Sequence, residues 1–140
     1  MRVYDGEGMI LGRLCAAAAK DALLGEDVKI VNCSKIIISG DKKKVFANEK
    51  AKRARKGYPL KSAKFSRLPD RFVRRTVRGM LPHKRERGRT AHERIMCYID
   101  FPEGLKEEKM VIAKGAKANK LPTLKFTTVG ELCTWLGGKR

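Results

Sequence analysis

The opening third of the chain has the pattern of a strand, a helix and two further strands. Residues 1–4 read as a short strand before the polar turn at 5–8, and Gly25 marks the end of the helix that follows. Runs of β-branched residues at 28–31 and 36–38 predict buried strands. The apolar positions of the helix recur at Leu11, Leu14, Cys15, Ala18 and Ala22. Because strands separated by a helix cannot pair as a tight hairpin, we expect a parallel pair with a right-handed crossover.

The central part of the chain predicts two basic helices. Asp41 is suited to cap a helix over 42–56, which ends at Gly57. After a loop, residues 67–81 form the clearest amphipathic segment, and Pro82 prevents its continuation. Its apolar side holds Val73, Val77, Met80 and Leu81, and its basic side holds Arg67, Arg71, Arg74, Arg75 and Arg78. We expect one side to pack and the other to meet a partner.

The last part of the chain returns to strands after a short helix through Glu93. A strand is expected at 95–99, whereas residues 103–122 have no clear pattern. Alternation with polar neighbours predicts a further strand around Leu124 and Phe126. Residues 128–131 form a capping box that starts an apolar-faced final helix, with Val129, Leu132, Cys133 and Leu136 at helical spacing.

The positive charge of the chain is concentrated in its middle third. The net charge is +18 over 140 residues, a length that fits a single domain over 1–140. Residues 1–41 carry five basic and six acidic side chains, whereas residues 42–94 carry twenty basic and four acidic ones. Residues 95–140 add eight basic and five acidic side chains, and Asp70 is the only acid between 50 and 85. A surplus of this kind predicts a polyanionic partner, most simply a nucleic acid.

A membrane surface is the less suitable polyanion for this chain. The sequence has no long uncharged apolar run, lipidation signal or basic helix with large apolar residues opposite the charge. We therefore expect an intracellular, soluble protein. Its cysteines are far apart and lack a C-x-x-C pair, so most are expected to be small buried hydrophobes: Cys15, Cys33, Cys97 and Cys133.

Three enzyme-like patterns are each incomplete. The glycines at 6, 8 and 12 have one residue too many for a dinucleotide fingerprint, and no acid ends the second strand. His92-Glu93 lacks a second histidine four positions on, and Cys97 near His92 lacks an orienting group. A nucleotide-using enzyme built on the opening strands is the alternative from a different class, and a chromatin-type DNA-binding protein is a third. Some side chains are candidates for stacking on bases, although core or loop positions suit them equally: Tyr58, Phe65, His83 and His92.

Specific strings then resemble a known family. The segment DGEGMILGRLCA at 5–16 resembles the opening D-A-x-x-x-x-L-G-R-L-A-S of the large-subunit ribosomal protein family L13 (universal name uL13). RGMLP at 78–82 resembles that family's most recognisable internal motif, and its continuation is similar to the archaeal and eukaryotic branch. Gly6 stands in place of the usual alanine, and Cys15-Ala16 in place of Ala-Ser, which we interpret as small residues kept at helix-packing positions. The chain stops soon after its expected final helix, without the longer tail typical of eukaryotic members, and this favours an archaeal member.

The resemblance implies a three-layer α/β/α domain with a mainly parallel, about four-stranded sheet and a basic helical insert at about 42–94. It further implies a non-enzymatic, cytoplasmic constituent of the ribosome, whose partners are large-subunit rRNA and neighbouring ribosomal proteins. No cofactor, metal, membrane or small-molecule substrate is expected. The residues most favoured for RNA contact are Arg74, Arg75, Arg78, His83, Lys84 and Arg85. A second stretch holds Lys52, Arg53, Arg55, Lys56, Lys61 and Lys64. The remaining candidates in the basic segment are Arg67, Arg71, Arg87 and Arg89.

Overall fold

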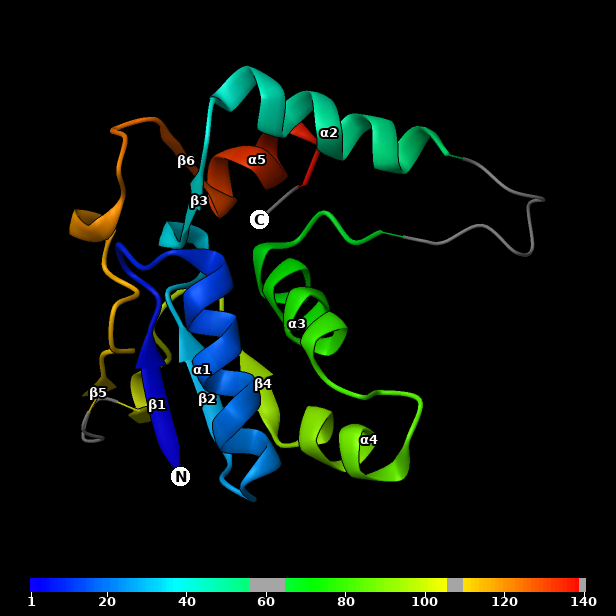
Figure 1. Cartoon of the computed structure of the whole chain (residues 1–140), viewed down its shortest axis with the longest axis vertical. Helices are drawn as coiled ribbons and strands as arrows, with labels where there is room; N and C mark the ends of the chain where they lie inside the picture. The colour runs from blue at the N-terminus through cyan, green and yellow to red at the C-terminus, as the bar shows by residue number, and fades with distance from the viewer. Residues whose placement is uncertain (56–64, 106–109, 139–140) are drawn as a thin grey trace.

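The centre of the molecule is a four-stranded sheet in which each pairing is parallel (Figure 1). The computed structural model describes residues 1–55, 65–105 and 110–138. Strands β1 (Arg2–Asp5), β2 (Val28–Val31), β4 (Ile95–Cys97) and β5 (Met110–Val111) lie in the order β4-β2-β1-β5. Helix α1 (Leu11–Leu23) connects β1 to β2. The parallel pair predicted from the first forty residues is therefore confirmed.

One face of this sheet is covered by helices. Helix α1 packs directly on it, and its apolar stripe is fully buried at Leu14, Cys15, Ala18 and Ala22. Helices α3 (Pro69–Met80) and α4 (Glu86–Glu93) lie against α1, with Val73 and Val77 completely buried (Figure 1). Helix α3 is thus a part of the core as well as a carrier of basic residues.

The opposite face of the sheet is covered by irregular chain. Because successive side chains of a strand point to opposite faces, Val3 and Val31 point away from α1. They pack with Leu105, Tyr98 and Phe101, which come from the segment after β4 and from the 3-10 turn η2 (Glu103–Leu105). The predicted α/β class with three layers and a mainly parallel sheet is confirmed, and this outer layer is extended chain with a short turn.

A second, two-stranded sheet lies beyond the end of the first. After the 3-10 turn η1 (Cys33–Lys35), strand β3 (Ile37–Ser39) pairs antiparallel with β6 (Phe126–Thr128). Helix α5 (Val129–Trp135) follows β6, and α2 (Lys42–Ala54) follows β3 and extends past α5 (Figure 1). A further 3-10 turn, η3 (Ala118–Lys120), precedes β6. None of the helices in the described ranges is long and apolar enough to cross a bilayer.

A buried carboxylate joins β1 to α1. Asp21 is only 6% exposed, and it accepts hydrogen bonds from the Tyr4 hydroxyl and from Arg2 Nη1, the latter at 2.9 Å. Burial, together with the hydrogen bond to Asp21, raises the pKa of Tyr4 to about 12. The first strand is therefore fastened to the helix by polar contacts as well as by apolar packing.

The structure corrects two positional expectations and shows which side of β6 is buried. Met80 was predicted on the packing side of its helix, but it is 42% exposed, because the chain leaves the helix there and Leu81 turns inward instead. In β6 it is Thr127 that is buried, whereas Phe126 is exposed. Gly6 is in the turn after β1, not at a helix-packing position: a Cβ there would lie 2.7 Å from the Val31 carbonyl oxygen.

Candidate nucleic-acid interface

Helix α3 separates its apolar and basic residues on two sides. Pro69 occupies the first turn, where its missing N–H costs nothing, and Asp70 adds a negative charge at the positive end of the helix. Val73 and Val77 are buried, whereas Arg71 and Arg78 are exposed on the other side. The two arginines are seven residues apart, which is about two helical turns. This spacing makes them a row that a phosphate backbone can contact.

The chain after α3 continues this basic surface. Three predicted residues are exposed in the segment that joins α3 to α4: His83, Lys84 and Arg85. Arg87 and Arg89 are exposed on α4, where Glu86 and Glu93 balance their charge. Gly88 allows α4 to fold back against this segment, since a Cβ at that position would collide with the carbonyl group of Pro82.

Two of the predicted arginines belong to a contact inside the protein. The Arg75 guanidinium carbon lies 3.9 Å from the centre of the Phe65 ring, and that of Arg53 lies 5.8 Å from the same ring. Arg53 also donates from Nη1 to the Phe65 carbonyl at 3.0 Å and from Nη2 to the Ser66 carbonyl at 3.1 Å. These contacts fasten the end of α2 to the chain leading into α3. Sequence spacing gave no sign of them.

Arg74 and His92 form a half-buried pair behind the exposed row. His92 Nε2 and Arg74 Nε are buried and have no hydrogen-bond partner among the described residues. Burial lowers the pKa of His92, and the nearby positive charges of Arg74 and Arg78 lower it further. The lowered pKa favours the neutral form of His92 beside the positive charge of Arg74.

The other candidates are distributed along α2 or fall outside the described ranges. Arg55 is exposed, Arg67 is exposed just before α3, and Lys52 forms an ion pair with Glu49 at 2.7 Å. The predicted contacts Lys56, Lys61 and Lys64, with Tyr58, lie outside the described residues. The ion pairs found among the described residues do not involve Arg71, Arg78, Lys84 or Arg85.

The cysteines have the buried character expected for most of them. All four are free thiols; Cys15, Cys33 and Cys133 are buried, and Cys97 is half-buried. Burial raises the pKa of Cys15 to about 12 and that of Cys133 to about 11. Within the described residues, no three histidine, cysteine, aspartate or glutamate side chains cluster as metal ligands would.

Comparison with known proteins identifies the family. The family model described as Ribosomal protein L13 matches residues 1–104. The chain belongs to the ribosomal protein L13 family. Three archaeal relatives of this L13-family chain, each named large ribosomal subunit protein uL13, illustrate the similarity. The relative from Methanococcoides burtonii is 40% identical over 99% of both chains, and that from Methanocaldococcus jannaschii is 38% identical over 99% of both. The relative from Archaeoglobus fulgidus is 41% identical over 96% of this chain and 86% of its own.

These similarities confirm the predicted family and its archaeal branch. Both strings that suggested the L13 family, at 5–16 and 78–82, lie inside the matched range. The archaeal relatives also match the last part of the chain, with β6 and α5, which the family model leaves out. The candidate interface on α3 and α4 therefore belongs to the part that the family as a whole shares.

Proposed function

We propose that this L13-family chain is a structural constituent of the large ribosomal subunit and binds its rRNA through the basic helical segment at about 42–94. Relatives that are named as large-subunit proteins match this chain over nearly their whole length. The single observation that best supports the binding surface is the exposed row of Arg71 and Arg78 on α3 and its continuation through Lys84 and Arg85. Within the single domain 1–140, the exposed residues Arg55, Arg87 and Arg89 extend this surface.

The mechanism is neutralisation of phosphate charge. When cationic side chains contact a nucleic-acid backbone, condensed counterions are released, and the repulsion that opposes RNA folding decreases. Arginine adds paired hydrogen bonds to phosphate oxygens, which a lysine cannot form. Because Val73 and Val77 anchor the opposite side of α3 in the core, the arginine row is held in a fixed orientation before RNA arrives. This rigidity supports a role in subunit assembly.

The arginines divide into two roles in this proposal. Arg71 and Arg78 are exposed and contact RNA directly. Arg53 and Arg75 hold Phe65, so they position the basic surface, although the outer edges of their guanidinium groups can still add to its charge. The protein acts in the cytoplasm as a part of the ribosome, beside other large-subunit proteins, without a membrane, cofactor or small-molecule substrate.

The alternative of a nucleotide-using enzyme is disfavoured by the turn after β1. In a dinucleotide site the third glycine lets the helix pack closely on the strand. Here the third glycine of the pattern, Gly12, meets no atom of another described segment within 4 Å of where a Cβ would be. The first, Gly6, is instead packed against the Ile36 side chain and the Val31 carbonyl, both about 2.7 Å from where a Cβ would be. Asp5 at the end of β1 already accepts hydrogen bonds from Asn32 and from the Glu7 backbone. The glycine at position 6 therefore serves internal packing, and we propose that the chain catalyses no reaction.

Salt dependence of RNA binding tests the proposed surface. We expect Arg71→Ala with Arg78→Ala to weaken binding to large-subunit rRNA and to lower the slope of log affinity against log salt by roughly one to two units, as two lost phosphate contacts require. Lys117→Ala with Lys120→Ala is the matched control, because it removes the same charge from exposed positions around η3. An unchanged slope for the arginine pair, or an equal change for the lysine pair, would contradict the surface.

Co-sedimentation tests the larger claim. The tagged chain should travel with large subunits in a density gradient and stay bound until high salt. Duplex DNA at matched salt should bind less tightly than rRNA. A chain that sediments alone in low salt, or that prefers duplex DNA, would overturn the proposed function in favour of a different nucleic-acid partner. A saturable nucleotide signal in calorimetry would favour the enzyme instead.

A further inference from the structure

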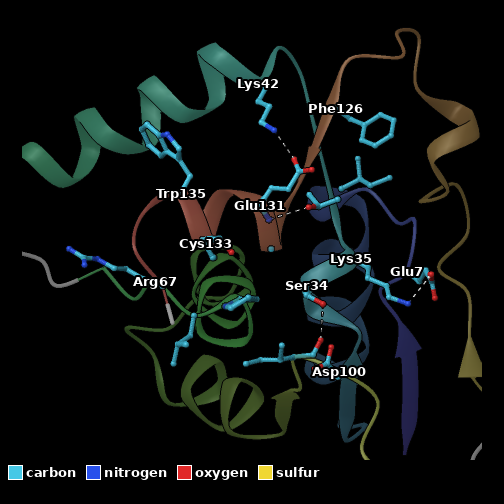
Figure 2. Close-up of a pocket in the computed structure, with 18 of the residues that line it drawn as sticks. Glu7, Ser34, Lys35, Lys42, Arg67, Asp100, Phe126, Glu131, Cys133 and Trp135 are labelled. Atoms are coloured by element: carbon cyan, nitrogen blue, oxygen red, sulfur yellow. Dashed lines mark hydrogen bonds and ion pairs between the residues drawn. The ribbon is translucent and has the colours of Figure 1, made fainter. Parts of the chain in front are cut away.

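A large open pocket borders the chain before α3, and neither Arg71 nor Arg78 lines it. It has a volume of about 920 Å³ and is formed where α5, β6 and the start of α2 meet η1 and the chain before α3 (Figure 2). The part of the chain after residue 124 supplies one wall, including Phe126 and Trp135. The proposed RNA-binding surface explains neither the size of this pocket nor its lining.

The wall of the pocket is aromatic and partly exposed. Phe126 is 45% exposed and Trp135 is 49% exposed, which is a large solvent-facing area for side chains of this kind. The rings of Phe46 and Trp135 lie 4.7 Å apart between their centres, so α2 and α5 are joined along one side of the pocket. Contiguous apolar surface, such as that of Phe46 and Trp135, commonly marks the binding site of another molecule when it is left open to water.

The charges around the pocket are balanced, unlike those of the rest of the protein. Lys42 pairs with Glu131 at 3.3 Å, and Lys35 pairs with Glu7 at 3.0 Å. Two further charges line the pocket, the cation of Arg67 and the carboxylate of Asp100, and neither forms an ion pair with a described residue. The lining therefore holds three acids and three bases in a chain whose net charge is +18.

This balance of charge favours a polypeptide over RNA as the molecule that occupies the pocket. A phosphate backbone would meet the carboxylates of Glu7, Asp100 and Glu131, and two of the three lining cations are already neutralised by them. A protein segment can place apolar side chains against an aromatic wall and pair charges of both signs at the rim, as the cores and rims of protein interfaces do. Arg67 and Asp100, from different segments, offer one charge of each sign.

We propose that this pocket binds a segment of another large-subunit protein, with apolar side chains against Phe126 and Trp135, a carboxylate at Arg67 and a cation at Asp100. The identity of the partner as a ribosomal neighbour rests on the proposed function. The pocket thereby gives the molecule two separate interfaces, a basic one for RNA and a neutral, aromatic one for protein.

Site-specific photocrosslinking in assembled subunits tests this inference. The photoreactive residue p-benzoylphenylalanine replaces Phe126 in one full-length variant and Trp135 in another, and subunits carrying each variant are irradiated. We expect both to give an adduct with the same polypeptide, whose crosslinked segment carries apolar residues and a carboxylate. Adding Asp100→Lys should lower the adduct yield about fivefold, as loss of roughly 1 kcal/mol of binding would, while co-sedimentation with the subunit persists.

The other outcomes separate this inference from the proposed function. Adducts with rRNA at both positions, or no polypeptide adduct in variants that do co-sediment, would overturn the protein-binding pocket and leave the RNA role intact. Failure of the unlabelled chain to co-sediment would overturn both proposals. If the Phe126 variant fails to fold, by circular dichroism, the Trp135 variant decides alone.

Discussion

At the scale of single residues, the most consequential contact lies in the core and not on the basic surface. Asp21 is a buried carboxylate whose two partners, Arg2 and Tyr4, both come from β1. Arg2 is largely open to water, so its ion pair with Asp21 adds little to the free energy of unfolding. The Tyr4 hydroxyl is buried and depends on Asp21 for its hydrogen bond. Of the two polar contacts between β1 and α1, the Tyr4 bond therefore contributes more to stability.

Asp21→Ala should lower the free energy of unfolding by about 2 kcal/mol, because it leaves a buried hydroxyl without a partner. Urea denaturation followed by circular dichroism measures the change. Glu26→Ala is a suitable control, since the ion pair of Glu26 with the N-terminal amine at 3.3 Å is a solvent-accessible contact, and the expected loss is below about 0.5 kcal/mol. Equal effects of the two substitutions would show that the Tyr4 bond is unimportant.

His92 should make the stability of the free protein depend on pH. Burial and the nearby Arg74 lower its pKa in the folded state, so the folded chain takes up a proton less readily than the unfolded chain. The folded state therefore has its full stability above the ordinary histidine pKa of about 6.5. Its free energy of unfolding decreases as the pH falls below that value toward the pKa of His92 in the folded state.

Urea unfolding at pH 7.5 and pH 5.5 measures this effect. The His92→Gln chain should lose less stability between the two pH values than the unmodified chain, whereas His83→Gln, at an exposed position, should resemble the latter. Identical pH dependence of the His92→Gln and unmodified chains would remove His92 as the cause.

At the scale of elements, the junction of α3 and α4 depends on the absence of a side chain. Gly88 is buried, and it brings the first turn of α4 into contact with the Pro82 carbonyl. Gly79, near the end of α3, has open space around its Cα by comparison. The two glycines therefore form a natural pair for comparison.

Gly88→Ala should destabilise the fold by about 1–3 kcal/mol, since the added methyl group forces α4 away from the turn. Gly79→Ala should be neutral or stabilising by up to about 1 kcal/mol, because alanine is the better helix former. Thermal unfolding monitored by circular dichroism compares the two. A larger loss from Gly79→Ala than from Gly88→Ala would contradict the packing described here.

The elements with strong periodicity were predictable, and the short ones were not. Helix α1, with its alanine stripe and Gly25 stop, and helix α3, with its valine and arginine sides, were expected close to their observed bounds. Strand β5 was missed because it has two residues and pairs only at the sheet edge. The buried side of β6 was not predicted: Thr127 is buried, and its hydroxyl donates to Glu131 at 2.9 Å, whereas Phe126 is exposed.

The candidate site was likewise predictable only where a periodic pattern marks its residues. The charged side of α3 was visible because its buried valines fix which arginines point outward. The role of Arg53 was not visible, because its partners Phe65 and Ser66 lie on another segment, and no periodic pattern encodes such a contact. The aromatic pocket was equally hidden, since Phe46 and Trp135 are far apart in sequence and meet only in the fold.

At the scale of the whole molecule, the net charge of +18 must oppose folding in the absence of RNA. Few of these charges are neutralised internally by ion pairs among the described residues. Like charges on a compact surface repel one another, and dissolved salt screens the repulsion over about 10 Å at 0.1 M. The isolated protein should therefore be stabilised by salt.

Raising NaCl from 20 mM to 200 mM should increase the melting temperature of the free chain by several degrees, corresponding to about 1 kcal/mol. Differential scanning calorimetry measures the shift. A chain with Lys43→Gln, Lys44→Gln and Lys50→Gln, all at exposed positions of α2, should show a smaller increase. A melting temperature that falls with salt in both chains would mean that attractive pairs outweigh the repulsion.

The burial of Val73 and Val77 also determines how far the protein can be shortened. A chain without residues 42–94 would lose Val73 and Val77 from its core together with most of its cationic side chains. The alanine stripe of α1 would then be open to water and prone to self-association. Substitutions meant to change RNA binding are therefore confined to the exposed side of α3, because residues on its other side, which recur every three to four positions, form the core.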